Sequence, residues 1–421
     1  MRRALPSTGA MAGPPPDVGD TGAPGSGSAF VSIRCTPTSE FSGDALPLEL
    51  PRASCYHRAV DFVFRTFSVP TDAGTALVAF TTRRGGVSPA PFDTNNLSHY
   101  VGDAESNVRE NRARTTRGIF GSWASDFVSV NQVHGTTVAV VEEVFREEGD
   151  SEAARLTGGI VPRHRSDIAA DAIVTARAQV PVGVLVADCV PVILVHEAGV
   201  VAAVHAGWRG IVAGVLHEAV RAIARLSSSP SRRENALLGF EKGEKKAPRA
   251  FAAEDAGIDA ALARSLTAFI GPAIKGCCYE VDHARAALLA QAAGVPDVLD
   301  GGVRSGGPVD IGRIAPNVNE GSTSHLSKHN PPRRSDAKKC FRVVADRVCV
   351  DLQCIARMQL TSIGIPAHQI VTVEVCTKCR ADLFFSYRRA VMAADDAPSY
   401  TPMHPRGTTG RQAGLVGIVQ Q

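Results

Sequence analysis

The stretch 188–210, DCVPVILVHEAGVVAAVHAGWRG, contains two short runs of apolar, β-branched residues with a turn between them. The runs VPVILV and VVAAV have the length and composition of strands, and HEAG supplies the glycine that a short hairpin favours. We expect a turn centred on Glu197, which pairs Cys189 with His205. Directly opposed side chains lie about 4.5–5.5 Å apart at Cβ, so this register predicts that the two residues are neighbours.

The residues that follow predict a helix over about 211–226, because apolar side chains recur there at helical spacing. The first turn of a helix presents free backbone N–H groups and the positive end of the helix dipole, which favour an anion. Arg209 adds a positive charge, and Gly210 lies at the expected helix start. The alternative is a buried cysteine against a structural histidine, with Trp208 filling the core.

A further histidine stands in VNQVHGTTV, where His134 follows a predicted strand and precedes a glycine. With Cys189 and His205 it would complete a set of two histidines and one cysteine. Three such ligands with an open fourth position are typical of catalytic zinc, whereas structural zinc normally has four protein ligands. The sequence alone therefore indicates a candidate metal site.

The chain contains ten cysteines among 421 residues, and we identify no secretion signal. This pattern favours reduced thiols rather than a disulfide framework. The motif CTKC, 376–379, is the one CxxC that we find, and a zinc ribbon needs two such pairs. We therefore expect most of these cysteines to be small buried residues.

Strands and helices mix without a strict βαβ repeat, so we expect an α/β or α+β layered fold with a mostly mixed sheet. The predicted strands are 77–82, 127–131, 137–141, 171–175, 182–187, 191–195, 200–204, 267–270 and 370–375. The predicted helices are 105–118, 211–226, 281–292 and 350–363.

The domain organisation follows from composition. Residues 1–60 are rich in Gly, Pro, Ala and Ser and predict a disordered tail. Residues 61–421 then form a single folded domain. Polar stretches at about 142–168, 227–262 and 301–338 are expected to be loop insertions, because the apolar segments between them are too short for separate cores.

Charge and hydrophobicity limit the partners. The formal net charge is +3, from 45 basic and 42 acidic residues, which gives no electrostatic case for nucleic acid. No apolar run approaches the roughly 20 residues of a membrane span. We therefore expect a cytoplasmic protein that acts on small molecules, with organellar targeting by the tail as an alternative. The oligomeric state stays open.

Several blocks, in order along the chain, resemble a known family. They are TTRRGGVS at 81–88, NLSHYVGD at 96–103, VRENRAR at 108–114, NQVHG at 131–135, DAIVT at 171–175, VADCVPVILV at 186–195, VAAVHAGWRG at 201–210, IGPAIKGCCYEV at 270–281, CTKCRADLFFSYRR at 376–389 and TGRQAGLVGI at 409–418. They resemble the laccase-domain proteins, also labelled multicopper polyphenol oxidases and now regarded as zinc-dependent purine nucleoside phosphorylases. The chain departs from the family at Gln412-Ala413, where a methionine is usual.

The resemblance implies a four-layer α-β-β-α fold, with zinc held by His134, Cys189 and His205. It implies phosphorolysis of adenosine, inosine, guanosine and methylthioadenosine, and hydrolytic deamination of adenosine. Phosphorolysis needs a held phosphate, for which Arg209 and Gly210 are candidates. Deamination needs an activated water molecule, which zinc chemistry can supply. Arg83 is a further candidate for contact with substrate or phosphate.

Three alternatives remain open. Cys189 could be a nucleophile with a histidine as base in a metal-independent amide hydrolase, similar to peptidoglycan-precursor editing. Copper polyphenol oxidation is physically weaker, because four copper ions need about ten histidines, many of them in His-x-His pairs. The chain has 12 histidines and no His-x-His, so zinc is favoured over copper. The non-enzyme alternative is a scaffold in which the metal only stabilises the fold.

Overall fold

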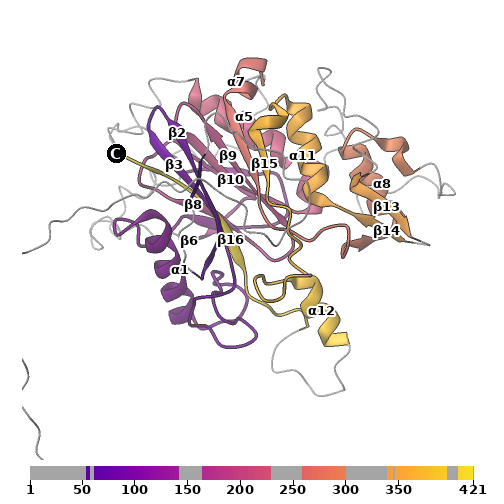
Figure 1. Ribbon diagram of the computed structural model, residues 1–421, viewed down its shortest axis with the longest axis horizontal. Coiled ribbons are helices and arrows are strands. Elements are labelled where there is room, and N and C mark those ends of the chain that lie inside the picture. Colours follow the sequence, from indigo (N-terminus) through magenta and orange to yellow (C-terminus); the bar gives the residue numbers. More distant parts are fainter. Residues whose placement is uncertain are drawn as a thin grey trace, which may run out of the picture. The chain divides into compact units, whose positions relative to one another are not determined.

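Two β-sheets pack against each other at the centre of the molecule (Figure 1). The computed structural model describes residues 54–56, 61–141, 164–228, 258–299, 339–344, 347–395 and 406–420. The chain divides into the units Met1–Thr36 and Pro37–Gln421, and every described residue belongs to the second.

The first sheet has five strands, and each neighbouring pair is antiparallel. In spatial order its strands are β1 (Ser54–Tyr56), β2 (Val63–Thr71), β3 (Gly74–Thr81), β16 (Gln412–Val419) and β8 (Val182–Val186). The C-terminal strand is thus inserted between strands from the first half of the chain. Such a pairing cannot be read from local sequence, because it joins distant segments.

The second sheet has six strands and is mixed. Its order is β15 (Ile370–Thr372), β11 (Leu266–Ile270), β9 (Val190–His196), β10 (Val200–Ala206), β7 (Ala172–Thr175) and β5 (Val138–Val140). The outer pairs β11–β15 and β5–β7 are parallel, and the inner pairs are antiparallel. All residues of β9 and β10 are buried, which explains why their sequences are continuous apolar runs.

The described residues also form two smaller sheets. One contains β12 (Glu280–Val281), β14 (Arg347–Val350) and β13 (Phe341–Val344), and the other pairs β4 (Ser129–Asn131) with β6 (His164–Ala169). The short helices are α7 (Ala260–Arg264), η1 (Pro296–Leu299), η3 (Ala367–Gln369) and α12 (Tyr387–Asp395).

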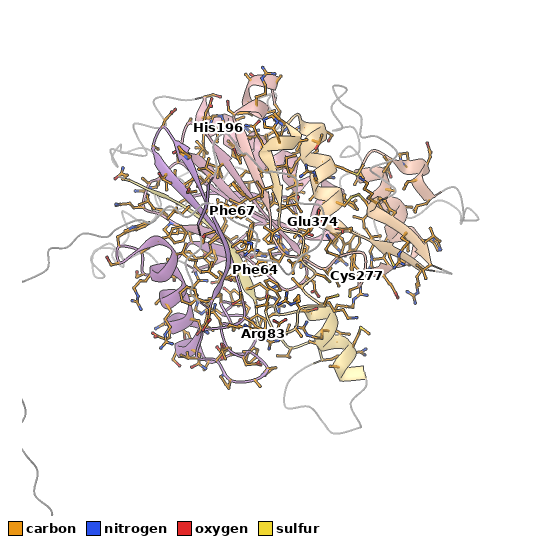
Figure 2. All side chains as sticks on the ribbon, in the orientation of Figure 1. Phe64, Phe67, Arg83, His196, Cys277 and Glu374 are labelled. Atoms are coloured by element: carbon orange, nitrogen blue, oxygen red, sulfur yellow. A yellow bond between two sulfur atoms is a disulfide. The ribbon has the colours of Figure 1, made fainter. Side chains whose placement is uncertain are left out.

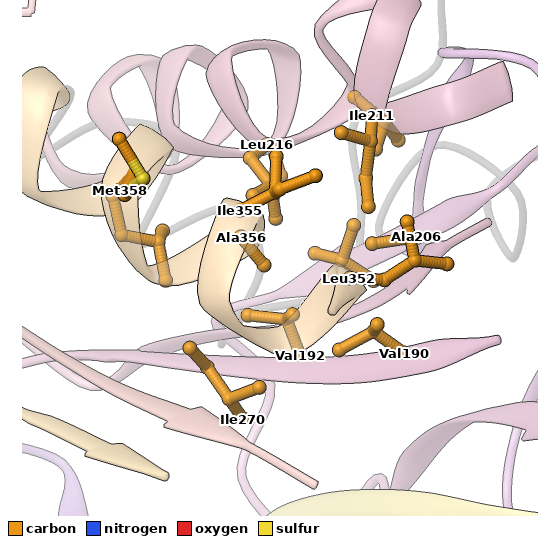
Figure 3. Packing of buried hydrophobic residues seen from close by; sticks show 14 of the residues in the cluster. Val190, Val192, Ala206, Ile211, Leu216, Ile270, Leu352, Ile355, Ala356 and Met358 are labelled. Atoms are coloured by element: carbon orange, nitrogen blue, oxygen red, sulfur yellow. The ribbon is translucent and has the colours of Figure 1, made fainter. Parts of the chain in front are cut away.

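Helices cover both outer faces, which gives the expected α-β-β-α order of layers. Helix α1 (Glu105–Phe120) shares a core cluster with residues of the five-stranded sheet. The six-stranded sheet is covered by α4 (Trp208–Ala213), α5 (Val215–Ser227), α8 (His283–Ala292) and α11 (Leu352–Ile363). In Figure 3, Leu352 and Ile355 of α11 lie above Val190 and Val192 of β9. A third cluster fills the space between the sheets.

The hairpin register differs from the prediction by two residues. His205 pairs with Pro191 rather than Cys189, and the last pair before the turn is His196 with Val200. Gly199, at φ 79°, takes the left-handed conformation that a three-residue turn requires, which moves the turn centre by one residue. Cys189 therefore lies just before β9, beyond the paired region, although at the same end of the hairpin as His205.

The predicted helix over 211–226 is two helices. The first begins at Trp208, three residues earlier than expected, and ends at Gly214. Gly214 has φ 90° and ψ 30°, a left-handed conformation that stops one helix and precedes the next. Asp351 caps α11, because its carboxylate accepts a hydrogen bond from the Cys354 N–H.

Other expectations have mixed outcomes. Cys340 and Cys354 form a disulfide, so the expectation of reduced thiols was wrong for this pair. The sequence predicts exposed positions for His196, in the hairpin turn, and His217, on a helix, but both side chains are buried. The expected tail and the three insertions lie mainly outside the described residues, with Ser54–Tyr56 and His164–Ala169 as described strands at their margins. Within the described residues, no helix is long and apolar enough to cross a bilayer.

Candidate metal centre

Three segments bring His134, Cys189 and His205 together. His134 lies in the loop between β4 and β5, Cys189 lies between β8 and β9, and His205 is in β10. One possible ligand atom from each residue lies within 4.8 Å of the others. The Sγ atom of Cys189 is 3.9 Å from Nε2 of His134, and the two imidazole rings meet edge to face at 4.8 Å. The site forms where the chain crosses from the five-stranded to the six-stranded sheet.

The carboxylate of Asp171 orients two of these residues. It is fully buried, and its Oδ1 atom lies 2.8 Å from Nδ1 of His205 and accepts the N–H of His134 at 2.9 Å. Its Oδ2 atom accepts the N–H of Gly135 at 2.6 Å. A carboxylate on one ring nitrogen fixes the tautomer and leaves Nε2 of His205 for a metal, as in carboxylate–histidine–zinc sets. Our sequence reasoning missed Asp171, although DAIVT contains it.

Two residues of the site have left-handed backbone conformations. His134 has φ 63° and Asp188 has φ 92°, which cost a residue with a side chain about 1–2 kcal/mol each. The hydrogen bond from the His134 N–H to the Asp171 carboxylate holds His134 in this conformation. The carboxylate of Asp188 accepts hydrogen bonds from the hydroxyls of Thr377 and Ser386 at 2.6 and 3.0 Å. These hydrogen bonds direct the Asp188 carboxylate toward the segment 377–388, and they fix the backbone that presents Cys189.

Electrostatics favours a thiolate at Cys189. Burial alone would raise the pKa of Cys189, but the charge of His205 and a hydrogen bond with His134 outweigh it and lower that pKa to about 6. Burial would lower the pKa of His205, but the Cys189 thiolate and the Asp171 carboxylate raise it to about 9. The site thus holds a negative sulfur at neutral pH, which is the form that binds metal cations.

The distance between two of the ligand atoms is close to that in a tetrahedral metal site. Zinc bonds of about 2.3 Å to sulfur and 2.0–2.1 Å to nitrogen place neighbouring ligand atoms about 3.6 Å apart. The observed sulfur–nitrogen distance of 3.9 Å is close to this value. Two nitrogens and one sulfur leave the fourth position for water or substrate, which is the arrangement of a catalytic rather than a structural zinc site.

Helix α4 begins directly beside these residues. Its N-cap is Gly207, and a Cβ atom there would lie 2.9 Å from Cδ2 of His134 and 3.3 Å from Sγ of Cys189. A Cβ atom at Gly210 would lie 3.1 Å from the carbonyl oxygen of Gly135. Glycine is therefore required for the helix to approach the site. The two predicted residues Arg209 and Gly210 are in the first turn, and Arg209 is exposed.

Two arginines flank the ring of Trp208. The guanidinium of Arg209 lies 4.5 Å from the ring centre and that of Arg285, from α8, lies 4.7 Å from it. The buried Nε atom of Arg285 has no hydrogen-bond partner. Arg285 also hydrogen-bonds Tyr279, whose raised pKa, about 12, has burial as its main cause and the Cys189 charge as a lesser one. Arg209 and Arg285 thus form a cationic cluster around Trp208, in the first turn of α4.

Sequence reasoning missed Arg285 and Tyr279. Tyr279 stands in the quoted block IGPAIKGCCYEV, and Arg285 follows four residues after that block. The contact of Arg285 with Trp208 depends on the packing of α8 against α4, which no local pattern indicates.

Arg83 is held by partners outside the candidate metal centre. Its guanidinium binds Asp93, with 2.8 Å between Nη2 and Oδ2, and donates to the carbonyl oxygen of Ala381. It lines a hollow of about 360 Å³ together with Arg84, Thr94 and Asp382. A substrate contact by Arg83 stays a prediction.

Two groups among the described residues have metal-ligand character. One is the set His134, Cys189 and His205, and the other consists of Cys277, Cys278, Cys376 and Cys379. Neither group has the many histidines of a three-copper cluster. The described part of the chain therefore gives no support to a four-copper oxidase. Phe384 and Phe385 are fully buried and belong to the core.

Comparison with known proteins links this site to a family. The family model described as multi-copper polyphenol oxidoreductase laccase matches residues 77–244 and 307–419. The chain is 37% identical over 220 residues to "Purine nucleoside phosphorylase ORF3" of Streptomyces griseus, which covers 52% of this chain and 69% of that protein. It is 27% identical over 353 residues to "Purine nucleoside phosphorylase YlmD" of Geobacillus stearothermophilus, which covers 83% of this chain and 92% of that protein.

A solved structure supports the fold. The crystal structure of YlmD from Geobacillus stearothermophilus aligns with a TM-score of 0.52 at 23% sequence identity. The alignment covers 87% of this chain and 99% of that chain. At this identity the likeness concerns the fold, which agrees with the four layers described above.

Proposed function

Because this chain belongs to the multi-copper polyphenol oxidoreductase laccase family, in which relatives are named purine nucleoside phosphorylases, we propose that it is a zinc-dependent purine nucleoside phosphorylase. The observation that carries the proposal is the set His134, Cys189 and His205 beside the start of α4. The proposed substrates are adenosine, inosine, guanosine and methylthioadenosine, with phosphate. Hydrolytic deamination of adenosine is proposed at the same site.

The reaction is a transfer of the sugar from the purine to phosphate. A phosphate oxygen forms a bond to the anomeric carbon, the glycosidic bond breaks, and its electron pair leaves with the base, which takes up a proton. The products are the free purine and the sugar 1-phosphate. A zinc ion held by the three residues supplies a Lewis-acidic charge at the reacting centre. The protein must therefore bind a dianion close to this group.

The cationic cluster of Arg209 and Arg285 is our candidate for that binding. Arg285 has a buried Nε donor without a partner, and Arg209 lies against the same indole ring as Arg285. Guanidinium groups bind phosphate oxygens in a planar, bidentate geometry. We therefore assign phosphate binding to Arg285 and Arg209, with the first turn of α4 and Gly210 beside them. Asp171 keeps His205 in the tautomer that binds the metal.

Purified zinc-loaded protein tests this proposal. Incubation with inosine should release hypoxanthine and ribose 1-phosphate only when phosphate is present, as measured by chromatography. Cys189→Ser should abolish the release. Asp171→Asn should weaken zinc binding by about 10- to 100-fold. Arg285→Gln should raise the KM for phosphate more than the KM for inosine, while the matched variant Arg114→Gln, on the exposed face of α1, leaves both unchanged.

Metal-stripped and zinc-loaded protein together distinguish the proposed phosphorylase from a second candidate function. The lowered pKa of Cys189 also suits a nucleophile in a metal-independent amide hydrolase. Under that alternative, metal-stripped protein would retain activity on amides, and a thiol-reactive substrate analogue would trap Cys189. Under our proposal, stripping zinc abolishes phosphorolysis and adding zinc restores it. Failure with every purine nucleoside tested, in zinc-loaded protein, would refute the phosphorylase function.

A further inference from the structure

Four cysteines form a second cluster outside the site described above. One sulfur from each of Cys277, Cys278, Cys376 and Cys379 lies within 4.8 Å of the others. Sγ of Cys379 is 3.6 Å from that of Cys277 and 3.4 Å from that of Cys278. The CxxC motif, which looked isolated in the sequence, thus gains its second cysteine pair from a segment about a hundred residues away.

The topology of the six-stranded sheet creates this meeting. Strands β11 and β15 are parallel neighbours, so the loops that follow them begin at the same end of the sheet, where both strands end. The loops are joined by the hydrogen bond from Thr377 N to Ala273 O at 3.0 Å. An ion pair joins Lys275 to Glu374 at 3.3 Å, and Figure 2 shows Cys277 and Glu374 in the same region.

Each cysteine pair lies on a tight turn. In the first loop, the N–H of Cys278 donates to the carbonyl oxygen of Lys275 at 2.8 Å. In the second, the N–H of Arg380 donates to the carbonyl oxygen of Cys376 at 3.1 Å. Backbone turns therefore aim two sulfurs from each loop at a common point.

The sulfur spacing matches a metal-thiolate site. Four zinc–sulfur bonds of about 2.3 Å in a tetrahedron place the sulfurs about 3.8 Å apart. The observed pairs at 3.4 and 3.6 Å are near this value. A disulfide would need about 2.0 Å between the atoms. Cys376 is buried, whereas Cys277 and Cys379 are exposed, so an ion can enter from solvent.

The cluster is connected to the residue next to Cys189. Thr377, inside the CTKC turn, donates its hydroxyl to Asp188 at 2.6 Å. From the other loop, the N–H of Ile274 donates to the carbonyl oxygen of Asp188 at 2.9 Å. Both cysteine-bearing loops therefore hold the strained residue that presents Cys189. A link between the two loops would therefore hold Asp188 in place.

We propose that Cys277, Cys278, Cys376 and Cys379 bind a structural zinc ion that clamps these two loops. Four thiolates in a closed tetrahedral arrangement are a structural zinc set, without the open position of a catalytic site. The ion would hold Asp188 through Thr377 and Ile274. This proposal depends on the cysteine geometry and not on the proposed phosphorylase activity.

Metal content tests the proposal. The full chain, purified under reducing conditions with excess zinc removed, should contain two zinc ions per chain by elemental analysis. Cys189→Ser should retain one ion, and adding Cys376→Ser and Cys379→Ser to it should leave none. The control Cys349→Ala, which changes a buried free cysteine outside both clusters, should retain two.

A second measurement keeps all four cysteines in place. Cobalt(II) added to the metal-free Cys189→Ser protein should give a thiolate-to-metal charge-transfer band and the strong d–d absorption of a tetrahedral complex. Peptide mapping without reduction should find the four thiols unlinked. Absence of the cobalt spectrum, a native disulfide within the cluster, or stoichiometric iron instead of zinc in this variant would each overturn the proposal.

Discussion

The carboxylate of Asp171 shows how a single buried residue organises the site. It accepts backbone N–H groups from the His134 loop and binds His205 in the neighbouring strand. Burial would raise the pKa of Asp171, but hydrogen bonding and the charge of His205 lower it below the ordinary value. An ionised carboxylate is the form that orients both histidines. The effect of one side chain thus reaches two of the three candidate ligands.

The thiol of Cys189 gives a pH-dependent prediction. Its pKa is lowered to about 6, so in metal-free protein the thiolate persists at neutral pH and is lost as the pH falls through 6. Alkylation of Cys189 by iodoacetamide, followed by mass spectrometry of its peptide, should therefore have an apparent pKa near 6 rather than 9. His205→Asn removes the main favourable charge and should raise that apparent pKa. An ordinary thiol titration in the unmutated protein would contradict the assignment.

At the scale of residues, the sequence predicted the reactive side chains better than their supports. Cys189, His134 and His205 could be selected because two histidines and a cysteine are a recognisable ligand set. Asp171, Tyr279 and Arg285 carry no such signal, because aspartate before a strand or arginine on a helix is common. Their roles arise from partners that are distant in the sequence.

Among the elements, the pair α4 and α5 decides how closely a helix approaches the metal centre. The chain turns into α4 at Gly207 and breaks it at Gly214. Local periodicity predicted one continuous helix, because the apolar spacing runs through the break. The left-handed conformation at Gly214 separates two short helices whose directions are set by different neighbours.

Substitution by alanine should have different consequences at Gly207 and at Gly214. Gly207 has φ −71°, which alanine adopts easily, but the new Cβ would press on His134 and Cys189. Gly207→Ala should therefore weaken zinc binding by about 10-fold, a size typical of disturbed ligand support. Gly214→Ala meets open space but must take a positive φ, so it should lower the free energy of unfolding by about 1–2 kcal/mol.

Zinc competition titrations and denaturant unfolding measure these two effects separately. Gly214→Ala should bind zinc as the unmutated protein does. Equal losses of zinc affinity in both variants would show that the contact at Gly207 is not specific.

For the whole molecule, the space between the sheets holds the layers together. Phe269 of β11 is fully buried there and contacts Phe67 of β2, with 4.9 Å between ring centres. The segment that presents Cys189 links the same two sheets. Their packing therefore sets the distance between the loops that form the site.

Truncation at this interface should cost stability. Phe269→Ala should lower the free energy of unfolding by about 3–5 kcal/mol, because it leaves a cavity between the sheets. Val343→Ala, at a residue that is 42% exposed, should change it by less than about 0.5 kcal/mol. Urea unfolding monitored by circular dichroism gives both values. A small loss at Phe269 would mean that the sheets close over the cavity.

Hydrophobic periodicity and residue chemistry are local properties, so the sequence predicted the strands that form the six-stranded sheet, the longer helices and the candidate ligands. It did not predict β2 or β16, which are central strands of the five-stranded sheet. The tertiary structure alone decided the hairpin register, the insertion of β16 between β3 and β8, and the helix break at Gly214. It also decided that CTKC meets Cys277 and Cys278, and that Asp171 supports the metal centre. These features depend on contacts between distant segments, whose free energy comes from packing the layers and not from any one stretch of chain.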